Sequence, residues 1–220
     1  MLRKMNKTAI TLALLALYLS TADAFAFGKK PVTPPSNPDP SVIRARWENS
    51  QRDGALWSKY VFDLMPTEGA NLLAKTPNDI ASFCSNYSNL SVGEKKNFWV
   101  YLLSSMAELE SGHKPETSYV ESFRDAKGNR VVSRGLLQIS IESANAYGCG
   151  FRTESELHDP YKNLSCSMRI LNRWVNNDGR VAGKAGSAWQ GGARYWSVLR
   201  STNAPLAKIQ AWTQALDICR

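Results

Sequence analysis

The sequence has few of the residues that bind metals. Its 220 residues include only two histidines and four cysteines, and no two cysteines form a Cys-x-x-Cys pair. Structural zinc sites draw several ligands from such closely spaced groups. The scarcity therefore argues against a zinc, multi-metal or cluster protein, and we expect neither a metal nor a cofactor.

Long hydrophobic runs are also scarce. The main run covers residues 8–19, which is shorter than the roughly 20 apolar residues of a membrane-spanning helix. It follows three basic residues and precedes small residues that end at Ala26, the three-part pattern of a secretory signal peptide. We predict a signal peptide over residues 1–26 and no stable membrane span after cleavage, with an uncleaved anchor as the alternative. The lack of a cysteine near the cleavage region argues against a lipid anchor.

Acidic residues are outnumbered by basic ones. The chain has 27 lysines and arginines against 19 acidic residues, a net charge of +8. Cleavage after Ala26 would reduce these numbers to 24 and 18, so that the mature chain carries +6. A positive protein favours a polyanionic partner. Because export argues against nucleic acid, the bacterial cell wall and the membrane surface remain as candidate partners.

The distribution of prolines divides the mature chain. Five of the ten prolines fall within residues 29–40, where they favour an extended tether over a packed core. We predict a Pro-rich tether over residues 27–46 and a single domain over residues 47–220. With 43% hydrophobic residues, a domain of this length can bury a core, and we expect a monomer.

Apolar residues at helical spacing predict a mainly α domain. We expect a short helix over residues 77–84 and further helices over residues 55–65, 93–110, 141–147, 163–176, 193–199 and 205–218. Residues 112–134 are polar and rich in turn formers, with at most a short strand at Val131 and Val132. Long loops in compact domains are usually functional, so we predict that this loop region borders the active site.

The four cysteines all lie in the mature part of the chain. An even number in an exported protein favours two disulfides, and four cysteines allow three pairings. We favour Cys149 with Cys166 and Cys84 with Cys219. Free buried thiols are the alternative.

One carboxylate continues an apolar helix face. Leu103, Met106 and Glu110 are separated by three and four residues and so share one stripe of the helix. Glu108 lies on a different side. We expect burial to raise the pKa of Glu110, which suits a general acid working near neutral pH. A paired or exposed carboxylate at a helix end is the alternative.

Two motifs flank the polar loop, and one of them contains Glu110. Glu110 is followed by Ser111 and Pro115, and residues 135–139 read Gly-Leu-Leu-Gln-Ile. Together they resemble the soluble lytic transglycosylase family, which shares a lysozyme-like fold with goose-type lysozymes. Leu137 replaces the family's Met, and its later Tyr-Asn-Ala-Gly motif is not cleanly matched.

The resemblance covers residues 98–199 and includes residues 159–164, which look like the family's segment before its next helix. It implies a lysozyme-like single domain in which Glu110 is the catalytic acid and then the base. Gly135 would allow close backbone approach, and Gln138 would hydrogen-bond the glycan. The candidate substrate-binding residues are Ser111, Gly135, Gln138, Trp189 and Tyr195.

The reaction depends on a second carboxylate. Glycoside hydrolysis normally uses two, and goose-type lysozymes carry an acid where this chain has Ser140. Its loss favours the transglycosylase scheme, in which the muramyl 6-hydroxyl attacks and leaves a 1,6-anhydro end. The polar loop offers Glu116, Glu121 and Asp125. Of these, Asp125 is our candidate for holding a water, and its alternative role is to form a turn.

We therefore predict an exported enzyme, periplasmic or extracellular, that cleaves the β-1,4 bond between N-acetylmuramic acid and N-acetylglucosamine in peptidoglycan. A lytic transglycosylase is the first choice. A lysozyme-type muramidase, acting on normal or modified (for example N-deacetylated) glycan, is the alternative. A non-catalytic wall-binding protein and a membrane-active protein represent other classes. Glu110 and His113 have the Glu-x-x-His spacing of a helical metal site, but a single copy argues against one.

Overall fold

The computed structural model describes residues 43–200 and 204–220. The predicted signal peptide and most of the predicted tether, residues 1–42, lie outside the described residues. The last two tether positions belong to the packed structure. Ala45 is buried, and Arg46 forms an ion pair with Glu108 at 2.5 Å.

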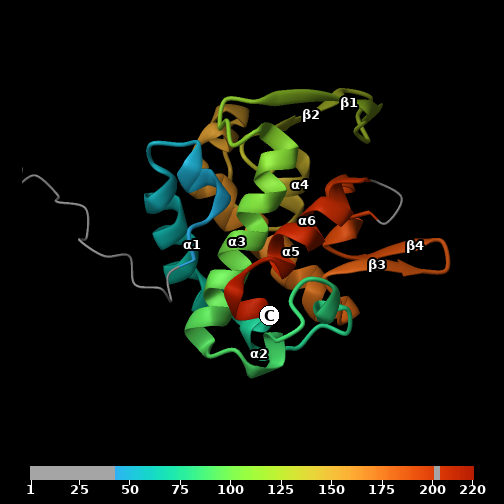
Figure 1. Ribbon diagram of the computed structural model, residues 1–220. Coiled ribbons are helices and arrows are strands. Elements are labelled where there is room, and N and C mark those ends of the chain that lie inside the picture. The colour runs from blue at the N-terminus through green and yellow to red at the C-terminus, as the bar shows by residue number, and fades with distance from the viewer. Residues whose placement is uncertain (1–42, 201–203) are drawn as a thin grey trace, which may run out of the picture. The chain divides into compact units, whose positions relative to one another are not determined.

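A long buried helix, α3 (Val92–Ser111), runs through the described part of the chain (Figure 1). At its start, the Ser91 hydroxyl accepts the Glu94 N–H, and the Glu94 carboxylate accepts the Ser91 N–H, which satisfies two otherwise free donors. In the middle of α3, residues all around the helix are buried, including Trp99, Leu103 and Met106. The helix ends at Gly112, whose φ of 62° is the left-handed conformation that glycine adopts readily.

Other helices cover α3. Both α1 (Gly54–Glu68) and α6 (Ala204–Gln214) contact it directly, and α5 (Pro160–Asp178) packs on α1 and α2 (Ala70–Ala74). A short helix, α4 (Ile141–Ala146), follows the second motif. The connections include short 3-10 turns at Arg46–Asn49, Ile80–Ser82, Tyr87–Asn89, Glu154–His158, Gly192–Arg194, Ser197–Leu199 and Asp217–Cys219. In the two described ranges, no helix combines the length and the apolar character needed to cross a bilayer.

Two antiparallel hairpins complete the fold. The strand β1 (Ser118–Arg124) pairs with β2 (Arg130–Arg134), and β3 (Ala182–Ala185) pairs with β4 (Ala188–Gly191). In Figure 1 the β1–β2 hairpin lies above the upper end of α3, and the β3–β4 hairpin projects at the right. The β1–β2 hairpin lines the candidate active site described below, whereas no residue of β3 or β4 does.

The mainly α class is confirmed, with most predicted helices within a few residues of α1, α3, α4, α5 and α6. The expectation of a largely strand-free loop over residues 112–134 is wrong. Most of β1 is exposed on both faces, so the sequence carries no alternating apolar pattern there. The β3–β4 hairpin is likewise too short and exposed to leave such a pattern.

The helices predicted over residues 193–199 and 77–84 are also wrong. Residues 192–199 form two 3-10 turns, because Trp196 has an extended backbone (φ −93°, ψ 124°) that separates them. This conformation places the buried Trp196 indole N–H against the Leu137 carbonyl at 2.9 Å. The segment at 77–84 forms a single 3-10 turn of three residues, of which Ile80 is buried.

Both favoured disulfides are confirmed. Cys84 pairs with Cys219 across 135 positions, and Cys149 pairs with Cys166 across 17. The first connects the segment before α3 to the C-terminus, next to the Ser85 hydroxyl that donates to the Cys219 carbonyl at 2.6 Å. The second joins the loop after α4 to α5.

We expect the Cys84–Cys219 disulfide to stabilise the fold more than the Cys149–Cys166 disulfide. The loop-entropy relation predicts how much each disulfide adds to the free energy of unfolding. Closing a loop of 135 residues adds about 5 kcal/mol, and closing a loop of 17 adds about 3 kcal/mol. Urea unfolding of the Cys84→Ser/Cys219→Ser and Cys149→Ser/Cys166→Ser double variants would measure the difference. An equal or larger loss in the second variant would contradict the expectation.

Candidate active site

Glu110, in the last turn of α3, faces a cleft of about 330 Å³. One of its carboxyl oxygens, Oε1, is fully buried and has no hydrogen-bond partner among the described residues. Glu108, two residues earlier, is held on another side of the helix by two hydrogen bonds from Arg46. The two glutamates therefore have the separate environments that the helical spacing predicts.

The surroundings of Glu110 favour its neutral form. Burial, supplemented by the negative charge of Glu121, raises the pKa of the Glu110 carboxyl to about 7, while the Arg200 guanidinium opposes the increase. An ordinary glutamate is ionised at this pH. Glu110 can therefore hold a proton near neutrality and release it to a leaving group, as a general acid must.

A second carboxylate enters the cleft from β1. Glu121 lines it together with Phe123, and on β2 with Val131 and Ser133. The Ser133 hydroxyl donates a 2.6 Å hydrogen bond to the Glu121 carboxylate. Our sequence reasoning noted Glu121 only as one of three acids in the loop. Residues two positions apart on a strand share a face, so Glu121 and Phe123 both reach the cleft, but the exposed strand leaves no core pattern that would single out Glu121 in the sequence.

Asp125, the residue favoured from the sequence, occupies the turn of this hairpin. Its Oδ1 accepts the backbone N–H groups of Lys127 at 2.9 Å and Asn129 at 2.7 Å. The bonds from Asn129 and Lys127 hold the pKa of Asp125 below its usual value. The side chain does not line the cleft. Asp125 therefore has the turn-forming role that was its alternative, and Glu121 is the carboxylate that accompanies Glu110.

The second motif is held in place by a side chain of α5. Asn163 is fully buried; its Oδ1 accepts the Leu137 N–H at 2.9 Å, and its Nδ2 donates to the Arg134 and Leu157 carbonyls at 3.0 Å each. Gly135 has φ 79°, and a Cβ there would lie 2.2 Å from the Leu157 carbonyl oxygen. The close approach at Gly135 is thus to the protein's own backbone, and the residue does not line the cleft.

The tight turn at Gly135 delivers Gln138 to the cleft. The backbone of Gln138 has a positive φ of 47°, which is uncommon for a residue other than glycine. The amide nitrogen donates to the carbonyls of Gly135 at 2.8 Å and Thr117 at 3.2 Å. The amide oxygen is buried without a partner among the described residues. Gln138 therefore presents a fixed hydrogen-bond acceptor, which fits a hydroxyl or an N–H of a sugar.

Of the remaining candidates, Tyr195 lines the cleft, whereas Ser111 and Trp189 do not. Burial raises the pKa of Tyr195 to about 12, and its hydroxyl is hydrogen-bonded with Ser143 and the backbone of Ser140. The Ser111 hydroxyl donates to the Ala107 carbonyl of its own helix at 3.1 Å. Trp189 lies on β4, with the Lys184 ammonium 4.1 Å from its ring centroid.

His113 is engaged elsewhere and does not join Glu110 in a metal site. Its Nδ1 lies 2.7 Å from the Ser50 hydroxyl and its Nε2 lies 2.9 Å from the Ser104 carbonyl. Across residues 43–200 and 204–220, no group of three or more His, Cys, Asp or Glu side chains is arranged to bind a metal.

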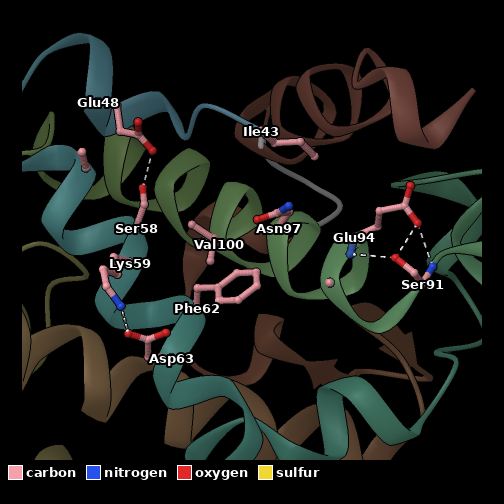
Figure 2. A pocket seen from close by; sticks show the side chains of 12 residues that line it. Ile43, Glu48, Ser58, Lys59, Phe62, Asp63, Ser91, Glu94, Asn97 and Val100 are labelled. Atoms are coloured by element: carbon pink, nitrogen blue, oxygen red, sulfur yellow. Dashed lines mark hydrogen bonds and ion pairs between the residues drawn. The ribbon is translucent and has the colours of Figure 1, made fainter. Parts of the chain in front are cut away.

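A larger cavity, of about 650 Å³, lies between α1 and the first half of α3 (Figure 2). Six of its polar side chains form three hydrogen-bonded pairs: Ser58 with Glu48, Lys59 with Asp63, and Ser91 with Glu94. Val100, its lining residue nearest in sequence to Glu110, is ten residues away, about 15 Å along the helix. The carboxyl whose pKa is raised towards neutrality, Glu110, therefore belongs to the smaller cleft.

Comparisons with known proteins place the chain in a family. Residues 89–212 match the model of the Transglycosylase SLT domain. The solved structure of Bd0314 DslA, wild-type form 2, has a TM-score of 0.79 and 52% sequence identity, and the match covers 82% of this chain and 99% of that chain. None of the curated proteins compared matches this chain.

Two Glu-to-Gln mutants of DslA have the same TM-score of 0.79, with identities of 51% and 52% over 81% and 82% of this chain and 98% and 99% of theirs. The two mutated glutamates are eleven residues apart in DslA. Glu110 and Glu121 have the same separation. From the family match over more than half of its length and the identity with DslA, this chain belongs to the transglycosylase SLT family and has its lysozyme-like fold.

Proposed function

We propose that this protein cleaves the β-1,4 bond between N-acetylmuramic acid and N-acetylglucosamine in peptidoglycan, with Glu110 as the general acid. Family membership supports the substrate class. The observation that carries the chemistry is the pair of carboxylates in one cleft, of which Glu110 has a pKa of about 7. The basic mature chain would concentrate on the anionic wall, and no cofactor takes part.

The two carboxylates favour hydrolysis. Glu110 protonates the bridging oxygen as the bond to the muramyl C1 breaks. Glu121, held by the Ser133 hydroxyl, accepts a proton from the water that attacks C1, or stabilises the positive charge developing there. The product would be a muramic acid with a free reducing end. The Gln138 amide oxygen and the Tyr195 hydroxyl would orient the sugars beside the acid.

Transglycosylation is the second candidate, favoured by the family and by the missing acid at Ser140. In this scheme the muramyl 6-hydroxyl replaces water as the nucleophile, and Glu110 serves first as acid and then as base. The product would carry a 1,6-anhydro end. The candidates differ in their need for Glu121, which only the hydrolysis scheme uses to handle a water molecule.

We place the enzyme in the periplasm or outside the cell. Peptidoglycan lies outside the cytoplasm, and the two disulfides suit an oxidising compartment. The sequence pattern over residues 1–26 supplies the export signal in this proposal.

We expect Glu110→Gln and Glu121→Gln each to lower kcat on purified peptidoglycan by about 10²- to 10⁴-fold, the usual contribution of a general acid or base. Turbidity clearing would give the rates, and mass spectrometry of the released muropeptides would give the end group, on walls with and without N-deacetylation. Asp125→Asn is the matched control, because Asp125 belongs to the same hairpin but lies outside the cleft; its rate should stay within about twofold of wild type.

Clearing by Glu110→Gln equal to that by the wild type would refute Glu110 as the general acid, whereas binding without clearing by the wild type would leave a wall-binding protein. Retention of activity in Glu121→Gln, with anhydro ends as the products, would replace hydrolysis by transglycosylation.

We expect kcat/KM to fall as the pH rises through about 7. The general acid must be protonated, and the pKa of Glu110 is raised to about 7 by burial. Above this pH the rate should fall about tenfold per pH unit. A pH–rate profile on soluble muropeptide dimers would measure it, and a profile flat between pH 6 and about 9 would contradict Glu110 as the acid.

The same carboxyl should make the protein less stable at higher pH. Because the folded-state pKa of Glu110 is raised from 4.5 to about 7, its contribution to stability is fully present below about pH 4.5 and is lost as the pH rises through about 7. The loss amounts to about 3 kcal/mol. Glu110→Gln should therefore gain stability over wild type at pH 8 and not at pH 4.

Urea unfolding of wild type and Glu110→Gln at both pH values would test this difference. The control is Glu116→Gln, which removes an exposed carboxylate and should give the same stability difference from wild type at both pH values. An equal gain at pH 4 and pH 8 for Glu110→Gln would mean that ionisation is not the cause.

A further inference from the structure

The cleft has basic residues near its β1–β2 lining. Arg194 and Arg200 line the cleft, and Lys184 on β3 lies outside it, over the same Trp189 ring that Arg200 approaches. We propose that Lys184 and Arg200 bind a carboxylate of the peptide stem attached to the muramic acid, so that the enzyme prefers glycan strands that carry their stems. This inference rests on the proposed function and adds a peptide subsite to it.

One aromatic ring brings the two cations together. The Lys184 ammonium lies 4.1 Å from the centroid of the Trp189 ring, and the Arg200 guanidinium carbon lies 5.6 Å from the same centroid. Both charges are thus held near one half-buried indole on β4. Cation–π contacts of this kind keep long side chains in place without neutralising them.

Neither cation forms an ion pair within the described part of the chain. Among the described residues, no carboxylate lies within ion-pair distance of Lys184 or Arg200, and the Arg200 Nε donates only to the Ala193 carbonyl at 3.2 Å. Arg194 differs, because Asp178 holds it by two hydrogen bonds at 2.7 and 2.9 Å. Arg200 in the cleft and Lys184 beside it are therefore the charges that this side of the site offers to an anion.

The chemistry of the substrate indicates which anion this is. The sugars of the strand are uncharged, and the lactyl group of muramic acid is an amide where a stem is attached. The carboxylates of an intact strand therefore lie on its stems. Arg200 lines the same cleft as Glu110, so a stem bound there would belong to a muramic acid near the bond that is cleaved. A guanidinium suits a carboxylate because its planar N–H donors match the two carboxylate oxygens.

The test compares strands that carry stems with the same strands after an amidase has removed them. We expect wild type to have a higher kcat/KM on the strands with stems. In Lys184→Gln/Arg200→Gln this preference should fall by about tenfold, the effect of losing a hydrogen bond to a charged group. The matched control is Lys127→Gln, which removes one charge from the turn of the β1–β2 hairpin and should keep the preference. Assays at pH 5 keep Glu110 protonated in every variant.

Three results would overturn the inference. Equal rates of wild type on both substrates would show that the stem is not bound. An equal loss by the double variant on both substrates would mean general attraction or binding of the lactyl carboxylate, which is free on stripped strands. If the preference of Lys127→Gln for strands with stems fell to the level of the double variant, the net charge of the protein alone would account for the preference. Failure of wild type to cleave either substrate would instead refute the proposed function.

Discussion

The candidate site depends on keeping one carboxyl at the end of α3 away from water. Glu110 holds a proton near neutral pH because its Oε1 is buried and lacks a hydrogen-bond partner among the described residues. This burial requires that the β1–β2 hairpin and the turns at 192–199 close on the same end of the helix. The ion pair between Arg46 and Glu108 fixes the other side of that end. An unsatisfied carboxyl is costly, and the large core around α3 has to offset the cost.

The second motif shows how the same packing that stabilises the fold also forms the site. Asn163 satisfies three backbone groups of the chain segments around residues 134–157, so its loss would leave several buried groups without partners. These hydrogen bonds hold a rigid turn in which Gly135 and Gln138 have left-handed backbone conformations. With its amide nitrogen fixed by two carbonyls, Gln138 cannot rotate to offer a donor. A bound sugar therefore meets an acceptor of fixed position.

The sequence reveals the half of the site that lies on regular helices. The spacing of Leu103, Met106 and Glu110 predicts the environment of the acid, because a helical repeat determines which side chains share a face. It does not reveal Glu121 as the partner, since β1 is exposed on both faces and carries no core pattern. The pair of cations is equally hidden: Lys184 and Arg200 meet at Trp189 through tertiary packing. Local periodicity contains no information about such contacts.

Two charged residues that line the cleft act on Glu110 in opposite directions. The negative charge of Glu121 raises the pKa of Glu110, and the positive charge of Arg200 lowers it. A stem carboxylate bound to Arg200 would cancel part of the positive field without touching Glu121. The pKa of Glu110 would then rise further in the complex, and the acid would hold its proton more firmly when a correct strand is in place. Substrate recognition at Arg200 and proton donation at the end of α3 would thereby be coupled through charge alone.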